Sequence, residues 1–151
     1  MTMMRKIFVC FLACLIIQGL AGCRAEPRGK IRQVYVENRY DMVATIRLHL
    51  GERLQWNCEQ MPPNDQNASD YPFDDLPLNA RIAITVPPRE VDPTPENLTT
   101  IQTVVHVRRN IPQTPETKVL YFILEKDLTM RLVVLTEAEM EAMKRSGTRP
   151  D

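Results

Sequence analysis

The sequence predicts an all-β fold, an antiparallel β-sandwich of about seven strands that closes with one short helix. Hydrophobic side chains alternate with polar ones along several stretches after residue 30, which is typical of strands with one buried face. Prolines gather between these stretches, where they mark loops because proline cannot donate to a sheet ladder. The intervals are too short for helical crossovers, and 44% hydrophobic residues in 151 can supply one core.

The clearest strand pair covers residues 42–59. Residues opposite each other in a hairpin point to the same side of the sheet, so the loop length must keep the apolar faces together. A three-residue loop at 51–53 does this by pairing Leu48 with Trp56 and Ile46 with Cys58. The inward side chains are then Met42, Ala44, Ile46, Leu48, Leu50, Leu54, Trp56 and Cys58.

Further strands are predicted at residues 31–37, 78–86, 99–109, 118–125 and 128–135. The alternation is clean in 78–86, where Ala80, Ile82 and Ile84 face inward. Residues 119–124 are apolar on both faces, which indicates a central strand covered on both sides. A tight loop at Lys126 and Asp127 folds this strand onto the last one.

A helix begins after Thr136. Thr136 and Glu139 match the capping box, in which each side chain satisfies a free backbone amide of the other residue. Met140 and Met143 form a narrow apolar stripe, and Gly147 suits the left-handed residue that ends a helix. We expect this helix to cover one end of the sandwich. The domain therefore spans residues 31–147, followed by a tail at 148–151.

The first 22 residues have the composition of a secretory signal peptide. Arg5 and Lys6 give a positive start, and residues 7–17 form an unbroken apolar run. Eleven residues are too few to cross a hydrocarbon core, which needs roughly 17 to 25 in a helix. The segment is therefore predicted to be removed and not to span the membrane permanently.

The residues that follow this run, Leu20, Ala21, Gly22 and Cys23, resemble the lipobox of bacterial lipoproteins. The resemblance implies cleavage between Gly22 and Cys23 and acylation of Cys23, with palmitate among the lipids, so that the protein is anchored to a membrane. Residues 23–30 then form a lipidated tether. Arg24 stands where an aspartate retains enterobacterial lipoproteins in the inner membrane, which implies an outer-membrane protein facing the periplasm.

Several function classes are disfavoured by composition and motifs. The 19 basic and 19 acidic residues balance, whereas nucleic-acid binders usually have a strongly basic face. Metalloprotease, CxxC, phosphate-loop and GxSxG motifs do not occur. His49 and His106 are predicted to face solvent, whereas Cys58 is predicted to face the core. The Cys58 thiol is therefore separated from any histidine that could act as its base. We therefore predict no catalytic residues, no cofactor, no metal and no small-molecule substrate.

The most informative loop runs from about residue 60 to 75, and loops of this length without their own structure are usually functional or disordered. Aromatic residues flanked by acids suit a protein-binding loop, since exposed aromatics are favoured anchors. Two interpretations compete, one in which the rings bind a partner and one in which they form a lid on the core. The loop does not match an EF-hand, because Asp70 replaces the turn glycine and Leu76 the bidentate glutamate, which leaves an irregular calcium site as an alternative to a solvated loop. The candidate residues are Asp70, Tyr71, Phe73, Asp74 and Asp75.

The order of features in the mature chain resembles small enterobacterial lipoproteins described as type VI secretion immunity proteins. The likeness rests on the lipobox, the hairpin at 44–58, the proline-rich middle and the closing passage at 115–140. It implies a protein that binds and neutralises one toxin without chemistry. The alternatives are an accessory lipoprotein of an envelope assembly, such as a secretion system or pilus, and a lysozyme inhibitor. Known lysozyme inhibitors have disulfide-bearing cores, whereas Cys58 is the one cysteine that remains after cleavage and acylation.

Overall fold

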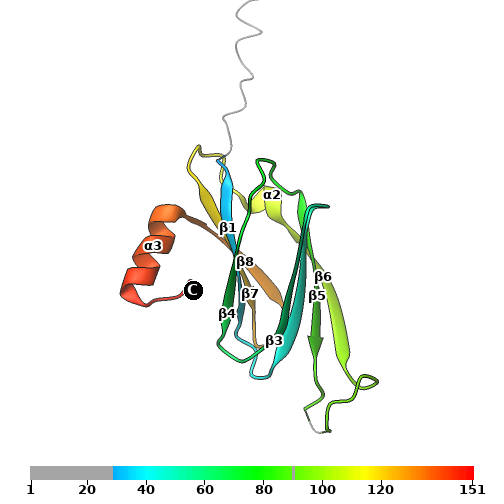
Figure 1. Ribbon diagram of the computed structural model, residues 1–151. Coiled ribbons are helices and arrows are strands. Elements are labelled where there is room, and N and C mark those ends of the chain that lie inside the picture. The colour runs from blue at the N-terminus through cyan, green and yellow to red at the C-terminus, as the bar shows by residue number, and fades with distance from the viewer. Residues whose placement is uncertain (1–28, 90) are drawn as a thin grey trace, which may run out of the picture.

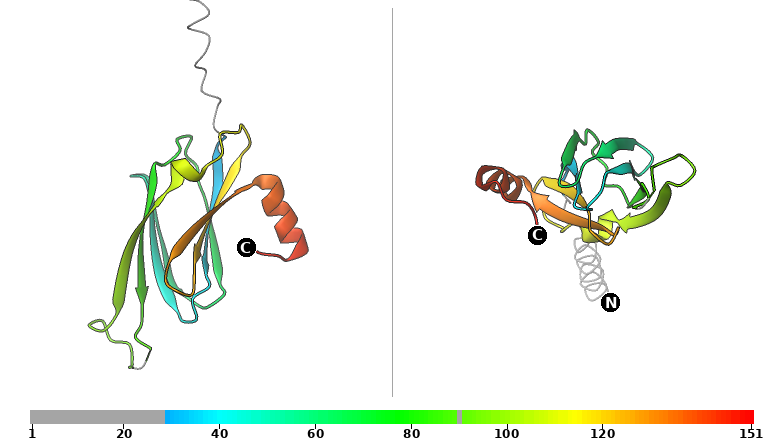
Figure 2. Two further views of the ribbon diagram at one scale, coloured as in Figure 1. Left: turned by 180° about the vertical axis from the view of Figure 1, so that it is seen from behind. Right: turned by 90° about the horizontal axis from the view of Figure 1, so that it is seen from below.

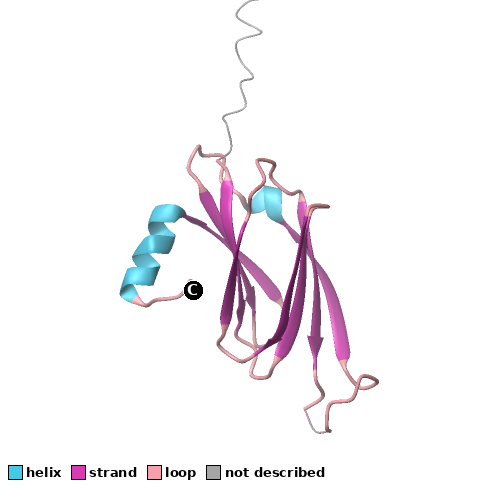
Figure 3. Cartoon of the chain, viewed as in Figure 1, coloured by secondary structure: helices cyan, strands magenta, loops and turns pink. Residues whose placement is uncertain are grey.

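The computed structural model describes residues 29–89 and 91–151, so the signal peptide, Cys23 and most of the tether lie outside the described residues. The described chain is a sandwich of two four-stranded sheets, which confirms the predicted all-β fold (Figures 1 and 3). Its elements in chain order are β1 (Ile31–Asn38), β2 (Ala44–Leu50), β3 (Leu54–Met61), β4 (Gln66–Asp70), β5 (Asn79–Val86), β6 (Thr99–His106), α2 (Val107–Asn110), β7 (Lys118–Leu124), β8 (Met130–Thr136) and α3 (Glu137–Ser146).

Sheet A has the strand order β4-β1-β7-β8 and sheet B the order β3-β2-β5-β6. All neighbours are antiparallel except β1 and β7, which run parallel with Val34 opposite Leu120. A parallel pair needs a long connection between its strands. Here that connection contains all of sheet B together with β4. The sandwich therefore contains one parallel strand pair, whereas a purely antiparallel sandwich was predicted.

The hairpin between β2 and β3 has the predicted register. Ile46 lies opposite Cys58 and Leu48 opposite Trp56. Gly51 opens the turn with a φ of +59°, a left-handed conformation that glycine adopts without the steric cost that a Cβ brings. The loop length that keeps the apolar faces together is therefore the one the chain uses.

Strand β4 is not among the predicted strands, because its residues have no alternating hydrophobic side chains. It lies at the edge of sheet A, antiparallel to β1, with Ala68 opposite Tyr35. Most of its side chains are exposed, so backbone hydrogen bonds and not core packing define it. The 60–75 loop of the prediction is therefore divided by a strand, and its last part begins at Tyr71.

Strand β6 is shorter than predicted. It ends at His106, and residues 107–110 form the single turn α2, in which Val107 is buried. Val107 continues the apolar pattern of the strand, and for this reason the strand was predicted to reach residue 109. Arg108 and Arg109 are exposed on α2 rather than at a strand end.

The core has two parts. The larger lies between the sheets, and the smaller lies between sheet A and α3, where Tyr35, Tyr121 and Met140 meet and the two tyrosine rings stack at 5.4 Å. Strand β7 is buried along its whole length because it faces both parts, as predicted. Both parts are built from residues 31–140, so a chain that starts after Cys23 contains the entire core.

Helix α3 has the predicted caps but a different position. The Thr136 side chain accepts from the Glu139 amide, the Glu139 side chain accepts from the Thr136 amide, and Gly147 ends the helix at φ +67°. The helix lies along the outer face of sheet A rather than over one end of the sandwich (Figure 2). Met140 anchors it because the outer face of β7 is apolar and needs a cover.

The strands define two ends of the sandwich. The proximal end is the one where residue 29 leads into β1, and it also holds residues 71–78 and 111–117 (Figure 1). The distal end holds the loops at 39–43, 62–65, 87–98 and 125–129. At the proximal end, the buried Lys118 donates to Thr114 Oγ1 at 2.7 Å and to the Glu116 carbonyl at 2.6 Å, which orders the loop against which Gly29 packs.

Candidate functional site

The candidate loop Asp70, Tyr71, Phe73, Asp74 and Asp75 lies at the proximal end, and its aromatic rings turn inward. Tyr71 is 4% exposed, and its hydroxyl donates to the Asp75 carbonyl at 3.1 Å. Burial, and then the charge of Asp75, raise the pKa of this hydroxyl. Phe73 is half-buried and meets Tyr71 edge-on at 5.2 Å. Tyr71 is therefore not an exposed anchor, and the rings lie as the lid interpretation expects.

The carboxylates of this loop face basic partners on neighbouring segments. Asp74 pairs with Lys30 at 2.5 Å, and the hydrogen bond from Lys30 lowers the pKa of Asp74. Asp75 pairs with Arg53 at 3.3 Å, and Asp70 accepts from Gln33 at 3.2 Å. These contacts tie the loop to the proximal end. Within the described ranges, no group of three or more His, Cys, Asp or Glu side chains is placed to hold a metal ion.

A second surface, at the distal end, was not singled out from the sequence. We define the distal surface as the open hollow of about 550 Å³ between the start of β2 and the loop that joins β5 to β6. Two exposed hydrophobic side chains flank it, Val43 at 42% and Leu98 at 41% exposure. Three prolines contribute to its walls together with threonines, and the lining residues used below are Val43, Thr85, Pro87, Pro93, Pro95 and Leu98.

Exposed apolar side chains concentrate at this end. Five large hydrophobic residues of the described chain are strongly exposed, and three of them, Val43, Val91 and Leu98, belong to the distal loops or their borders. Val43 and Leu98 line the same hollow, and exposed apolar residues that share one surface indicate a site of interaction, whereas scattered single residues need no explanation.

The distal surface is held in shape by contacts from both sides. Arg89 reaches Asp41 at 3.3 Å and lies over the Tyr40 ring at 5.6 Å, which fastens the β5–β6 loop to the β1–β2 loop. The buried Asn38 side chain donates to the carbonyls of Met42 and Met61 at 2.9 Å and thereby fixes the chain beside Val43. Fixed proline φ angles further limit the conformations of the loop.

Within the loop, Asn97 closes a turn. Its side chain accepts from the Thr94 amide at 2.7 Å and donates to the Asp92 carbonyl at 2.9 Å. A surface that is ordered before binding loses less conformational entropy when a partner arrives. The signal that could have pointed to this surface is the group of prolines between residues 87 and 95, read together with the solvent-facing valine before β2.

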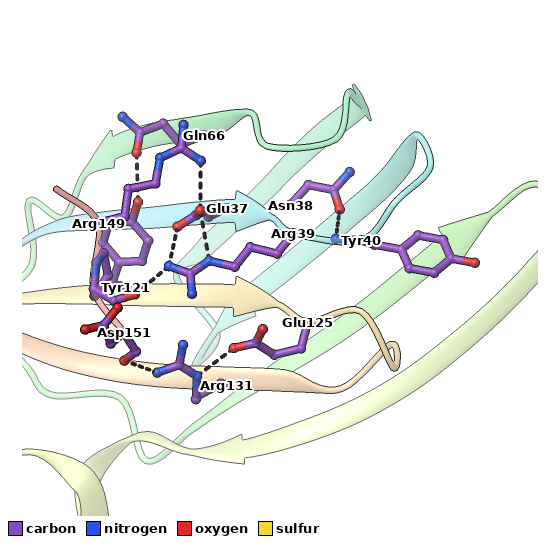
Figure 4. Close-up of polar contacts among 11 residues, drawn as sticks. Glu37, Asn38, Arg39, Tyr40, Gln66, Tyr121, Glu125, Arg131, Arg149 and Asp151 are labelled. Atoms are coloured by element: carbon purple, nitrogen blue, oxygen red, sulfur yellow. Dashed lines mark hydrogen bonds and ion pairs between the residues drawn. The ribbon is translucent and has the colours of Figure 1, made fainter. Parts of the chain in front are cut away.

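A polar cluster on the outer side of sheet A joins distant parts of the chain (Figure 4). Glu37 is 1% exposed and accepts from Arg39 at 3.0 Å and from Arg149 at 2.9 Å. Burial alone would raise the pKa of this carboxyl, but the hydrogen bonds from the two arginines lower it below its usual value. Nearby, Tyr121 donates to Gln66 at 2.7 Å, and its own pKa is raised by burial and by Glu37.

This cluster also holds the last described residues. Arg39 donates to the carbonyl of Pro150, and Arg131 donates to a backbone oxygen of Asp151 while pairing with Glu125 at 2.7 Å. Pro150 is buried. The segment predicted as a tail at 148–151 is therefore docked on sheet A. Every buried polar atom of the cluster has a partner, so we assign it a structural role.

The remaining titratable candidates lie apart. Cys58 is 2% exposed on the core face of β3, and burial raises its pKa to about 11 even though a hydrogen bond with Asn67 acts in the opposite direction. His49 lies on the outer face of sheet B, and His106 shares a hydrogen bond of 2.8 Å with Asn79. The described chain thus sets Cys58 and His49 on opposite faces of one sheet. Neither of its helices is long and apolar enough to cross a membrane.

Comparisons with known proteins show no family for this chain. No protein family matches the sequence, and no curated protein does. One solved structure that matches part of the chain is described as the NMR structure of the protein from Eubacterium rectale. It shares 7% sequence identity, covers 76% of this chain and 96% of its own, and has a TM-score of 0.37. This similarity supports neither a family nor a function.

Proposed function

We propose that this chain is a membrane-anchored, periplasm-facing lipoprotein that acts by binding one protein, and that this protein is a type VI secretion toxin which it neutralises. The distal surface is the proposed contact. The mechanism is stoichiometric occlusion, in which the bound domain covers the toxin and performs no chemistry. The proposal combines the lipobox resemblance at Leu20 to Cys23 with the position of the exposed apolar side chains.

One observation supports the binding role: exposed apolar side chains lie beside a hollow whose loops are held in place by hydrogen bonds, an ion pair and prolines. Val43 and Leu98 flank a hollow whose walls contain Pro87, Pro93 and Pro95. Protein partners bind most strongly through apolar anchors that fill pockets at the centre of an interface. A hollow of this kind accepts a protruding apolar side chain of the partner without a change of the loop.

The position of the anchor fits this role. Cys23 precedes Gly29 by six residues, which can reach at most about 20 Å when fully extended. Gly29 enters the sandwich at the proximal end, and the distal surface lies at the other end of the strands (Figure 1). A lipid on Cys23 therefore keeps the domain in the compartment where a toxin arrives and leaves the distal surface farthest from the tether.

A competition experiment tests this function. The gene is deleted and replaced by the wild type, by Leu98→Asp, or by Leu78→Asp, and each strain is exposed to sister cells with an active or a disabled type VI system. Leu78 is the matched control because it is 59% exposed but borders the proximal end of β5. We expect the deletion and Leu98→Asp to lose survival only against active attackers, and Leu78→Asp to survive like the wild type.

Equal survival of the deletion and wild-type strains under active attack would contradict the immunity function. The accessory role in an envelope assembly predicts a different result, namely a secretion or adhesion defect in the deletion strain without any attacker. A third result is a deletion strain that dies under attack and a Leu98→Asp strain that survives like the wild type. This result would support the immunity function and would show that the distal surface is not the contact with the toxin.

A further inference from the structure

Strand β6 is a free edge of sheet B, and it differs from the other three edge strands of the described sandwich. Edge strands have unpaired backbone N–H and C=O groups, and natural proteins protect them with charges, prolines, bulges or short length. Strand β6 (Thr99–His106) has eight residues, TTIQTVVH, with no formally charged side chain, no proline and no glycine. Its pairing with β5 is continuous from end to end.

Each of the other edges is protected. Strand β4 has five residues and ends in Asp70. Strand β3 contains Glu59, a left-handed Gln60 and a shift of register against β2. Strand β8 contains Arg131, which is paired with Glu125. Strand β6 has none of these protections, and on the side away from β5 it has no hydrogen-bonded neighbour, although β8 of the other sheet packs close to it.

The side chains of β6 are also incompletely buried. Ile101 and Val105 remain half-exposed. Val104, on the outer face, is 55% exposed. A strand added beside β6 would cover these side chains on both faces of the sheet and would satisfy the free backbone groups.

The charges around β6 indicate which strand fits. The loop before β6 contains the exposed acids Asp92 and Glu96, and the turn after it contains the exposed bases Arg108 and Arg109. In an antiparallel pair of identical strands, the acidic end of each copy lies beside the basic end of the other, and this happens twice. A two-fold symmetric interface must be self-complementary in this way.

We infer that two copies of this chain pair through antiparallel β6 strands and form a continuous eight-stranded sheet. The inference does not depend on the proposed function. Antiparallel pairing sends the proximal ends of the two copies in opposite directions. If both copies carry the proposed lipid anchor, their strands lie along the membrane, and each distal surface lies beside the proximal end of the other copy.

The test is the mass of the non-acylated chain from Arg24, which contains the entire core, measured by sedimentation equilibrium over roughly 1 to 200 μM, a range suited to micromolar dissociation constants. We expect the mass to rise toward that of two chains. Val104→Lys places two like charges near the symmetry axis and is expected to weaken pairing at least about tenfold. Gln55→Lys, at an exposed position of β3 on the opposite edge of the same sheet, is the control and is expected to pair like the wild type.

A charge exchange tests whether the two β6 strands pair in antiparallel orientation. It changes only exposed side chains, which are not needed for folding of the domain. Glu96→Arg and Arg109→Glu should each weaken pairing, and the double variant should restore it, because the complementary ends are rebuilt with opposite signs. A wild-type chain that stays monomeric at all concentrations would overturn the inference. Equal pairing of Val104→Lys and Gln55→Lys, or a double variant no better than the single ones, would also overturn it.

Discussion

Glu37 and Arg149, 112 positions apart in the chain, form an ion pair of 2.9 Å in which the carboxylate is almost fully buried. The pair joins the end of β1 to the segment after α3 and lies near Tyr121 (Figure 4). Tyr121 also packs with Met140 of α3 on this outer face of sheet A. The last residues of the described chain thus belong to the folded domain. Removing the carboxylate leaves two guanidinium groups without their shared acceptor.

We therefore expect Glu37→Ala to destabilise the domain by about 3 kcal/mol, since breaking one partner of a buried pair typically costs about 3 to 5 kcal/mol and the arginines here keep some solvent contact. Urea unfolding monitored by circular dichroism measures this loss. Glu59→Ala, at an exposed position, is the control and should stay within about 0.5 kcal/mol of the wild type. Equal stability of the two variants would contradict the structural role of Glu37.

Acid should weaken the same contact. The pKa of Glu37 is lowered in the folded chain, so its stabilising contribution is fully present above the unfolded carboxyl pKa of about 4.3 and is lost as the pH falls through the lower folded pKa. Glu37→Gln does not titrate and should show a shallower loss of stability below about pH 4.3. Unfolding free energies at several pH values test this, and parallel curves for wild type and Glu37→Gln would refute it.

Cys58 should be inert in the folded protein. It is buried beside the hairpin partner Ile46, and its pKa is raised to about 11, so little reactive thiolate exists at pH 8. A thiol reagent is expected to label it slowly in buffer and rapidly in denaturant. Fast labelling of the native chain would show that β3 does not have the described register.

Gly29 should not tolerate a side chain, because it packs directly on the backbone of the loop ordered by Lys118. A Cβ at this position would lie 1.6 Å from the Glu116 carbonyl oxygen. We expect Gly29→Ala to cost about 1 to 3 kcal/mol, the range for overpacking. Gly147→Ala is an informative comparison, since its Cβ meets no atom within 4 Å and only the left-handed backbone at φ +67° opposes it. A neutral Gly29→Ala would mean that the chain enters the sandwich differently.

The membrane anchor stays a prediction from the sequence, because Cys23 lies outside the described residues. Cys23→Ser removes the sulfur that the lipobox resemblance assigns to the lipid. The variant is expected to lose palmitate labelling and to move from the membrane to the soluble fraction, while the folded domain keeps its melting temperature. Unchanged membrane fractionation of Cys23→Ser would exclude the anchor.

Much of the fold could be predicted because it depends on patterns that lie close together in the sequence. The hairpin at Ile46 and Cys58 follows from alternation plus loop length, and the cap at Thr136 follows from two residues three positions apart. Strand β4 could not be found in this way, since backbone pairing with β1 and not side-chain burial creates it. The parallel pairing of β1 with β7 is a property of the whole topology.

The candidate site was harder to predict than the fold. Tyr71 is an aromatic residue in an acidic loop, which is typical of an exposed anchor. Its hydroxyl donates to the Asp75 carbonyl and its ring packs on the core, and these contacts are known only from the three-dimensional structure. Val43 and Leu98 are 55 positions apart and become neighbours because β2 and β5 pair and the proline loop folds back beside them. Sequence patterns identify such residues only as isolated apolar positions.

A binding measurement with the protein partner tests whether the distal surface is the contact. The partner recovered by affinity capture from the producing strain is titrated against the wild type, Leu98→Asp and Leu78→Asp. We expect Leu98→Asp to weaken binding at least tenfold, about 1.4 kcal/mol, and Leu78→Asp to leave the dissociation constant unchanged. Equal dissociation constants for wild type and Leu98→Asp would contradict this expectation.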